Sequence, residues 1–251
     1  DALEKLVDEH KPKLIYLIPT FGNPSGATLT LERRKRVLEL AVRTQTLVIE
    51  DDPYGDLYFQ APPPPSLLAL APQIPGSMNW LAHCGSLSKI MSPGLRLGWL
   101  VAPPALLAQT TMCKQFSDAN TSTLAQATAA AYLQSGRLPA AVEKVRTTYA
   151  ARARQMGACL QRELGAAVEF SEPHGGMFFW VRLTGATGYT QDAAAYARQC
   201  VEQLVAFVPG AAFFAEQPDP SFLRMSFATA NEANIAEGVA RMAQALRQTP
   251  C

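Results

Sequence analysis

The sequence has no long uncharged apolar run, no paired cysteines and no strong excess of one charge. Of its 251 residues, 48% are hydrophobic and 17% are charged. No window approaches the roughly 18 apolar residues that a membrane span needs. The formal net charge of +1 gives no electrostatic footprint for nucleic acid. These absences predict a soluble globular chain that can form a sizeable core.

The five cysteines are odd in number, scattered and never in C-x-x-C spacing, which argues against a disulfide framework and against a zinc site. His10, His83 and His174 are far apart and form no H-E-x-x-H pair, so we interpret them as structural residues and expect no metal. The first ten residues carry neither an apolar signal core nor an Arg/Ser-rich transit pattern. A reducing cytoplasm is the predicted location.

The most basic stretch is the run from Arg33 to Arg36, and Glu39 follows it on the same predicted helix. Mixed charge on one helix is typical of a face that water covers. We therefore interpret the run as a solvated helix face and not as a nucleic-acid patch.

Apolar, β-prone runs at 14–18 and 46–49 predict two strands, the second ending in the acids of 50–52. A helix between them is expected to begin near Thr30, which can act as its N-cap. Strand, helix and strand with near-continuous apolar strands predict a βαβ unit in a parallel sheet that is buried on both faces.

The rest of the chain divides into a loop, a helical region and an alternating region. Further strands are expected at 80–83 and 97–101, whereas the proline run within 60–75 predicts an extended surface loop. Helices are expected from 104 to 165, including a long one over 139–164. The last third alternates, with strands expected at 167–169, 177–183, 206–208 and 223–227 and helices at 192–204 and 233–247. The predicted fold class is α/β, with residues 1–138 in a larger, mostly parallel domain and 139–251 forming a connecting helix and a smaller α+β domain.

Four short motifs occur in a fixed order, three of them directly after predicted strands. They are Asn23-Pro24-Ser25-Gly26, Asp51-Asp52-Pro53-Tyr54, Gly85-Ser86-Leu87-Ser88-Lys89 with the later Arg96, and Arg224 inside an apolar strand. Open parallel sheets bind ligands outside the carboxyl ends of their strands. Two hydroxyls, backbone N–H groups at a turn and an arginine are what a phosphate monoester needs.

Each motif alone leaves a second interpretation open. The first can be a plain Pro/Gly turn, a carboxylate of the second can be a helix N-cap, and Arg224 can form a structural salt bridge instead of binding a substrate carboxylate. The S-x-x-K spacing within the third also occurs in penicillin-binding enzymes, but their S-D-N and K-T-G companions are absent here.

In this order the motifs resemble those of the fold-type I enzymes that use pyridoxal 5'-phosphate (PLP), specifically the class I/II aminotransferases. The resemblance runs from about residue 14 to residue 247, and its detail is similar to the branch of 2-aminoadipate and kynurenine aminotransferases. It implies transfer of an amino group from an L-amino acid to a 2-oxo acid in a ping-pong cycle, in a homodimer.

The resemblance also implies a role for each motif residue. Lys89 would hold PLP covalently and then act as the base that moves the substrate proton, while Asp51 would pair with the pyridinium nitrogen. Asn23 and Tyr54 would hydrogen-bond the 3'-oxygen of the ring. The phosphate would be bound by Ser86, Ser88 and Arg96, and the substrate carboxylate by Arg224.

Members of that family carry further cofactor-binding residues before the Asn motif, and nothing in this sequence corresponds to them. We therefore expect an N-terminal segment upstream of Asp1 in the natural protein. Without such a segment we expect an apolar sheet edge, an uncovered face, weak PLP binding and no turnover. Two alternatives have the same fold: the effector domain of a GntR-type transcription regulator and a PLP-dependent lyase.

Overall fold

The computed structural model describes residues 2–186 and 188–249 and divides into two compact units. The N-terminal unit consists of Asp1–Thr20, Thr28–Leu57 and Ala61–Lys144; the C-terminal unit consists of Phe21–Ala27, Tyr58–Gln60 and Val145–Cys251. None of the helices in these described stretches has the length and hydropathy of a membrane-spanning segment.

The N-terminal unit is built on a four-stranded sheet in the order β1-β2-β3-β4. Its strands are β1 (Leu14–Leu17), β2 (Leu47–Asp51), β3 (Leu81–Ser86) and β4 (Gly98–Val101). The first three strands are parallel, which confirms the predicted βαβ unit, whereas β4 runs antiparallel to β3. The segment 87–97 between them is shorter than the dozen or so residues that a parallel crossover needs.

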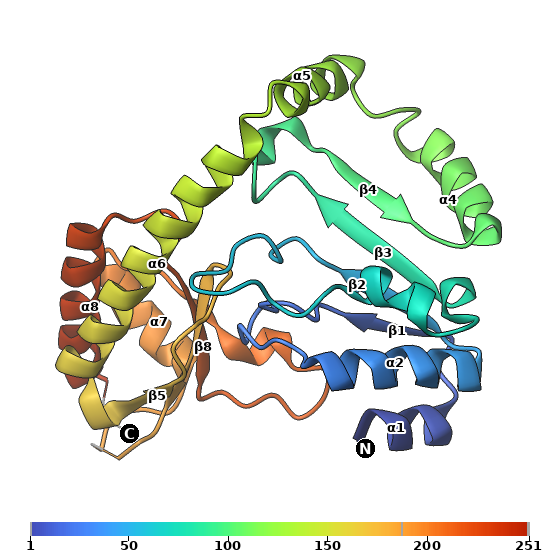
Figure 1. Ribbon diagram of the computed structural model, residues 1–251. Coiled ribbons are helices and arrows are strands. Elements are labelled where there is room, and N and C mark those ends of the chain that lie inside the picture. Colours follow the sequence, from blue (N-terminus) through green and yellow to red (C-terminus); the bar gives the residue numbers. More distant parts are fainter. Residues whose placement is uncertain (1, 187, 250–251) are drawn as a thin grey trace. The chain divides into compact units, whose positions relative to one another are not determined.

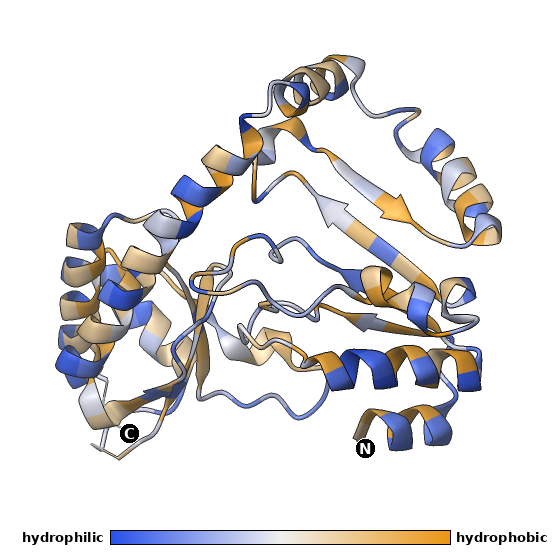
Figure 2. Cartoon of the chain, viewed as in Figure 1, coloured by the Kyte–Doolittle hydropathy of each residue, from blue (hydrophilic) through white to orange (hydrophobic). Residues whose placement is uncertain are grey.

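Helices cover one face of this sheet, and the longest of them beside β1 and β2 is α2 (Figure 1). The helices of the unit are α1 (Ala2–His10), α2 (Leu31–Thr44), α3 (Leu67–Leu70), α4 (Pro104–Ser117) and α5 (Thr123–Gln134). The hydroxyl of Thr30 accepts a hydrogen bond from the Arg33 N–H at 3.3 Å, so the predicted N-cap is confirmed. Hydrophilic and hydrophobic stretches alternate along α2 (Figure 2), as expected for a helix with one buried side.

One local prediction in this unit was wrong, and one helix was not predicted. Residues 2–10 form helix α1, about which no prediction was made from the sequence. The segment 60–75 is not extended throughout, since it contains α3 and a short 3₁₀ turn. Ser66 caps α3 through its side chain, and the apolar residues Leu67 and Leu70 enter the core. Burial of these leucines outweighs the extended preference of the prolines before them.

Contrary to the prediction from its apolar strands, the sheet is not buried on both faces, but has the uncovered face that we expected of the chain without an upstream segment. Its core face packs Ile15, Val48 and Leu81 against α1, α2 and α3. On the opposite face, Leu14 remains 47% exposed and Tyr16 55% exposed. Because side chains alternate along a strand, β2 sends its residues alternately to the core and to this open face.

The C-terminal unit contains an antiparallel sheet in the order β5-β6-β8-β7 with helices on its core side. Its elements are the part of α6 (Leu138–Glu163) from Val145 onward, β5 (Val168–Phe170), β6 (Phe178–Leu183), α7 (Ala193–Glu202), β7 (Val208–Pro209), β8 (Phe222–Ser226) and α8 (Glu232–Arg247). Phe179, Val181 and Leu223 point into the core. Trp180 and Arg224 are directly paired across β6 and β8 and therefore share the other face.

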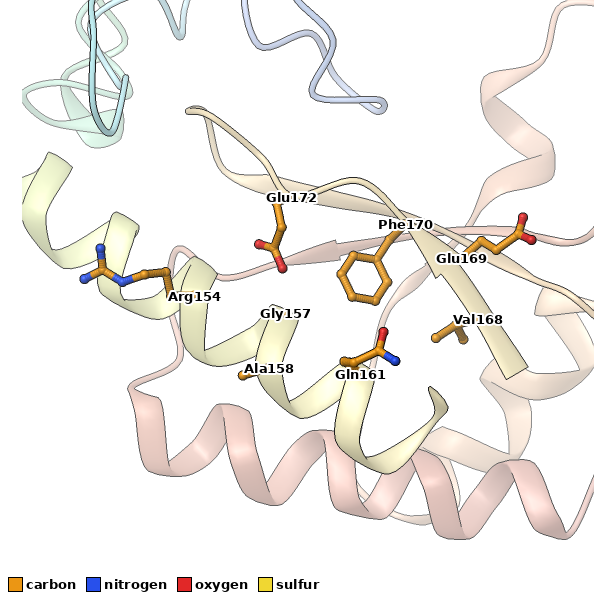
Figure 3. A pocket seen from close by; sticks show the side chains of 8 residues that line it. All are labelled: Arg154, Gly157, Ala158, Gln161, Val168, Glu169, Phe170 and Glu172. Carbon is orange, nitrogen blue, oxygen red and sulfur yellow. The ribbon is translucent and has the colours of Figure 1, made fainter. Parts of the chain in front are cut away.

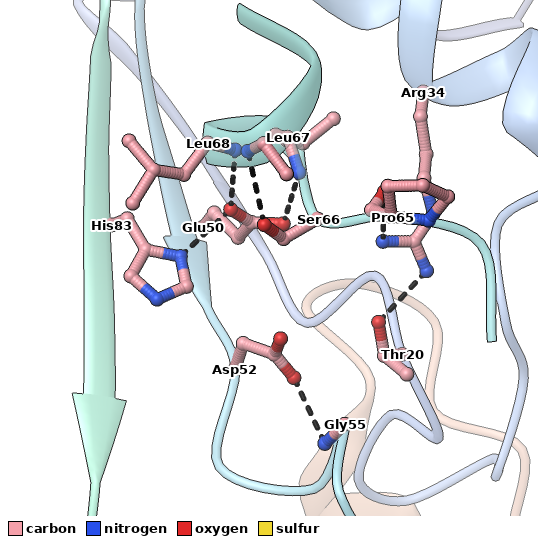
Figure 4. Close-up of polar contacts among 11 residues, drawn as sticks. Thr20, Arg34, Glu50, Asp52, Gly55, Pro65, Ser66, Leu67, Leu68 and His83 are labelled. Carbon is pink, nitrogen blue, oxygen red and sulfur yellow. Dashed lines mark hydrogen bonds and ion pairs between the residues drawn. The ribbon is translucent and has the colours of Figure 1, made fainter. Parts of the chain in front are cut away.

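The expectation that the run from Arg33 to Arg36 forms a solvated face was wrong for Arg34, whose side chain is fully buried. Its guanidinium donates to the carbonyls of Leu29, Pro19 and Pro65 and to the hydroxyl of Thr20, at distances from 2.7 to 3.3 Å. Figure 4 shows the contacts with Thr20 and Pro65. Burial lowers the pKa of Arg34, and the charge of nearby Glu50 opposes that shift. Arg34 therefore ties three loop segments to α2.

We predict that Arg34→Met lowers the free energy of unfolding by about 3 kcal/mol or more, because it leaves buried acceptors without donors and removes one cation near Glu50. Arg33→Met is the matched control, since Arg33 is exposed on the same helix, and its effect should stay within about 0.5 kcal/mol. Urea denaturation of both variants measures the difference. Equal, small losses of unfolding free energy in the two variants would contradict the conclusion that Arg34 ties the loop segments to α2.

Candidate active site

The predicted chemical residues of the N-terminal unit gather where β2 and β3 end. Asp51 is the last residue of β2, and its directly opposite partner on β3 is Cys84. Ser86 ends β3, and the turn that carries Ser88 and Lys89 follows at once. These parallel strands therefore bring the second and third motifs to the same edge of the sheet, which is where such sheets bind ligands.

The acid before Asp51 is a structural residue, because it points to the core. The Glu50 side chain has no exposed surface and accepts hydrogen bonds from the N–H groups of Leu67 and Leu68 at 2.7 and 3.1 Å. His83 Nδ1 lies 2.8 Å from the same carboxylate. This hydrogen bond raises the pKa of His83, while burial opposes the rise. Figure 4 shows the carboxylate between the start of α3 and the imidazole, so His83 is structural, as predicted.

The acid after Asp51 closes a turn. Oδ1 of Asp52 accepts a hydrogen bond from the Gly55 N–H at 3.0 Å (Figure 4). Burial raises the pKa of Asp52, and the negative charge of Glu50 raises it further. Asp52 is therefore engaged by the backbone of its own loop. That loop also contains Tyr54, which is buried.

Asp51 has different surroundings, on the open face of the sheet. Its Oδ2 accepts a hydrogen bond from the hydroxyl of Tyr16 on β1, with an oxygen-to-oxygen distance of 2.5 Å. Among the described residues, none donates a hydrogen bond to Oδ1 of Asp51. Unlike Glu50, whose two oxygens both accept hydrogen bonds, Asp51 therefore has an oxygen available to a ligand on the open face of the sheet.

The turn after β3 presents Lys89 and two serines. Ser86 Oγ lies 3.0 Å from the Ser88 N–H, which donates to it, and 3.4 Å from the Leu97 carbonyl. The hydroxyl of Ser88 and the amine of Lys89 have no hydrogen-bond partner within the described part of the chain. One serine therefore shapes the turn, while the other serine and the lysine keep their polar groups available.

The glycine that opens this motif is required by packing. A Cβ atom on Gly85 would lie 2.1 Å from the indole ring of Trp99, its partner residue on β4. The exposed Arg96 precedes β4 and donates from Nη1 to the Pro93 carbonyl at 3.0 Å. The hairpin of β3 and β4 thus carries Ser86, Ser88, Lys89 and Arg96 together.

In the C-terminal unit, two further predicted residues meet. Nη1 of Arg224 donates to Oδ1 of Asn23 at 2.7 Å. The guanidinium carbon of Arg224 lies 4.4 Å from the ring centroid of Phe178 and 5.0 Å from that of Phe213. Its buried Nε has no hydrogen-bond partner in the described stretches of the chain. A flat cation held by rings and an amide is suited to bind a carboxylate.

Asn23 is held in place by the turn around it. The N–H of Gly26 donates to the Gly22 carbonyl at 2.6 Å, and the Gly22 N–H donates to the Ala27 carbonyl at 2.9 Å. Gly26 has a φ of +68°, a conformation that glycine adopts without steric cost. The glycine of the N-P-x-G motif is therefore explained by its backbone, while Asn23 contacts Arg224.

Of two pockets in the described part of the chain, one includes a predicted site residue and the other does not. A pocket of about 590 Å³ in the C-terminal unit contains none of the predicted site residues (Figure 3). It is lined by Arg154, Gly157, Ala158, Gln161, Val168, Glu169, Phe170 and Glu172. A second pocket, of about 440 Å³ in the N-terminal unit, includes Arg96.

The sequence did not point to Tyr16. It lies within a short apolar strand, and only the register of β1 against β2, which pairs Tyr16 with Ile49, shows that its hydroxyl can reach Asp51. The one feature of the sequence that could have indicated this contact is the tyrosine hydroxyl within an otherwise apolar strand that was predicted to lie next to the strand ending in the acids.

Comparison with known proteins identifies the family. The sequence model of the family described as aminotransferase class I and II matches residues 1–242, so the chain belongs to this family. The family predicted from the motifs is thereby confirmed.

Two curated relatives and one solved structure illustrate the similarity. The 2-aminoadipate transaminase of Thermus thermophilus is 39% identical over 98% of this chain and 60% of its own length. Aromatic-amino-acid aminotransferase 1 of Thermococcus litoralis is 34% identical over 99% of this chain and 58% of its own. The crystal structure of LysN, the α-aminoadipate aminotransferase of Thermus thermophilus, complexed with N-(5'-phosphopyridoxyl)-L-leucine, has a TM-score of 0.91 at 38% identity. The structural match covers 99% of this chain and 62% of the LysN chain.

The predicted fold-type I architecture is confirmed by this structural agreement, with the mostly parallel sheet in one unit and the antiparallel sheet in the other. The chain spans about 60% of the length of the relatives that it matches.

Proposed function

We propose that the protein is an aminotransferase that moves an amino group from an L-amino acid to a 2-oxo acid, with PLP as its cofactor. The observation that carries the proposal is the placement of Asp51 and Lys89 at the carboxyl ends of neighbouring parallel strands, in a chain of the class I and II family. The named relatives are aminotransferases, and the LysN complex holds a compound that joins a phosphopyridoxyl group to leucine. For these reasons we propose an aminotransferase, and neither a transcription regulator nor a PLP-dependent lyase.

The groups of the chain fit PLP and an amino acid in their chemistry. The ring nitrogen of the cofactor needs an acid, and its 3'-oxygen needs hydrogen-bond donors. Its aldehyde needs a lysine, and its phosphate needs a set of hydrogen-bond donors. The available oxygen of Asp51, the Lys89 amine, the Ser88 hydroxyl and the exposed Arg96 supply such groups. The guanidinium of Arg224, held by Asn23 and two aromatic rings, suits the substrate carboxylate.

Lys89 and Asp51 carry the central roles in this proposal. When bound, PLP supplies an electron sink for the charge that develops at the substrate Cα. The amine of Lys89 would hold the cofactor and would move the proton at the substrate Cα as a general base. The carboxylate of Asp51 would accept a hydrogen bond from the protonated ring nitrogen.

The remaining residues bind and orient. Ser86, Ser88 and Arg96 hold the phosphate, with Ser86 also shaping the turn. Tyr54 and Asn23 hydrogen-bond the 3'-oxygen. Since the amide oxygen of Asn23 accepts from Arg224, its NH₂ group is the part that can donate to a ligand. Arg224 binds the substrate carboxylate in a planar fork that orients the Cα–H bond.

The proposal includes a homodimer in a reducing cytoplasm. The resemblance to the dimeric family supports the first part, and the unpaired pattern of the cysteines supports the second. We also propose that the larger domain ends at residue 138 and that residues 139–251 form the connecting helix and the smaller domain.

We predict that borohydride treatment of the PLP-loaded full-length protein attaches the cofactor irreversibly to Lys89. Among the motif residues only the Lys89 amine can form a Schiff base that hydride reduces. Peptide mapping by mass spectrometry locates the label. Lys89→Arg should abolish labelling, whereas Lys114→Arg, which alters an exposed lysine paired with Asp118, should leave it intact. A label on another lysine would contradict the assignment.

We predict that Arg224→Lys raises the KM for the amino acid by on the order of tenfold or more and changes PLP affinity little, because an ammonium cannot reproduce the fork. Arg182→Lys is the matched control. Arg182 lies on neighbouring β6 in an exposed ion pair with Glu169, and its replacement should leave KM unchanged. Steady-state kinetics and a PLP titration separate the two effects. Parallel losses of PLP and substrate affinity would make Arg224 a structural residue.

A further inference from the structure

A hydrogen bond across β1 and β2 connects Asp51 to a residue that the proposed mechanism does not use. The strands pair Tyr16 with Ile49, and Asp51 lies two residues beyond Ile49 on the same face of the sheet. The hydroxyl of Tyr16 donates to Oδ2 of Asp51 at 2.5 Å. This distance is typical of a strong, charge-assisted O–H to carboxylate bond.

The phenol is the donor in this pair. Partial burial of the Tyr16 ring raises its pKa, and the hydrogen bond to Asp51 raises it further, well above the ordinary value. Cys84, the partner of Asp51 on β3, has its pKa raised by burial and by the charge of Asp51. Tyr54 is a further titratable group that acts on Tyr16, and it also raises the pKa of Tyr16. Tyr16 and Cys84 are therefore neutral at physiological pH, and Tyr16 keeps the proton that it donates.

The contact also distinguishes the two oxygens of Asp51. Oδ2 is occupied by Tyr16, whereas Oδ1 accepts no hydrogen bond from the part of the chain that the structure describes. Without Tyr16, the side chain of Asp51 could rotate and become hydrated on a half-exposed face. The hydroxyl thus fixes which oxygen is presented and in which direction.

We propose that Tyr16 is a positioning residue for Asp51: its hydroxyl holds Oδ2, so that Oδ1 is presented to the protonated ring nitrogen of PLP. The inference rests on the proposed function, because it gives Asp51 the pyridinium as its ligand. Tyr16 acts through Asp51 and needs no contact with the cofactor.

The test compares Tyr16→Phe with wild type in the full-length protein loaded with PLP that is ¹⁵N-labelled in the ring. The ¹⁵N chemical shift reports whether the ring nitrogen is protonated, and a pH titration gives the pH at which the proton is lost. A less ordered Asp51 stabilises the pyridinium less, so we expect Tyr16→Phe to lose this proton at lower pH than wild type. The single-turnover rate with an amino acid should fall about tenfold, as is typical when a supporting hydrogen bond is removed.

Two further variants show whether the effect passes through Asp51. In an Asp51→Ala background, adding Tyr16→Phe should change neither the ¹⁵N titration nor the single-turnover rate. Tyr132→Phe is the matched control, because the hydroxyl of Tyr132 on α5 has no hydrogen bond within the described residues. It should behave as wild type in both measurements.

The outcomes separate this inference from the proposed function. A wild-type protein that binds no PLP, or binds it with a neutral ring nitrogen, overturns both. A Tyr16→Phe protein with the wild-type ¹⁵N titration overturns only the role of Tyr16. The same holds if the loss caused by Tyr16→Phe persists undiminished in the Asp51→Ala background, since Tyr16 would then act independently of Asp51.

Discussion

The organisation of the N-terminal unit depends on how the end of β2 separates three consecutive acids. Strand alternation directs Glu50 into the core and Asp51 to the open face, and the chain then turns so that Asp52 binds the Gly55 N–H. Three carboxylates in sequence would repel one another if they shared one environment. Their separation gives each a different set of partners.

Burial of Glu50 is stabilised by groups from three directions. The first N–H groups of α3 donate to the carboxylate, His83 contacts it from β3, and the charge of Arg34 acts from α2. A buried carboxylate is costly unless such partners satisfy it. Together they fix the end of β2 against the helices, and thereby set the direction in which Asp51 leaves the sheet.

Much of this arrangement could be predicted from local sequence. The βαβ unit, the Thr30 cap and the order of the four motifs depend on residues close together in the chain. The antiparallel β4 was also within reach, because the segment 87–97 is too short for a crossover. The burial of Arg34 was not predictable in this way, since its acceptors come from loops far apart in sequence.

The candidate site could be predicted only in part for the same reason, because some of its contacts join residues that are far apart in sequence. Asp51, Lys89 and Arg224 could be predicted as site residues because they belong to recognisable motifs, whereas Tyr16 contacts Asp51 only through the register of two strands. The pairing of Asn23 with Arg224 joins residues 201 positions apart. No pattern of spacing reveals that contact, although each residue was predicted to act on the same reaction.

The most direct test of the account compares Asp51→Asn with Asp52→Asn in the PLP-loaded full-length protein. The two changes are chemically identical at adjacent positions, and an amide at 52 can still accept the Gly55 hydrogen bond. The absorbance change of the cofactor on adding an amino acid measures the single-turnover rate. The account predicts that this rate collapses in Asp51→Asn and stays near wild type in Asp52→Asn. A near wild-type rate in Asp51→Asn, or a collapse confined to Asp52→Asn, would contradict it.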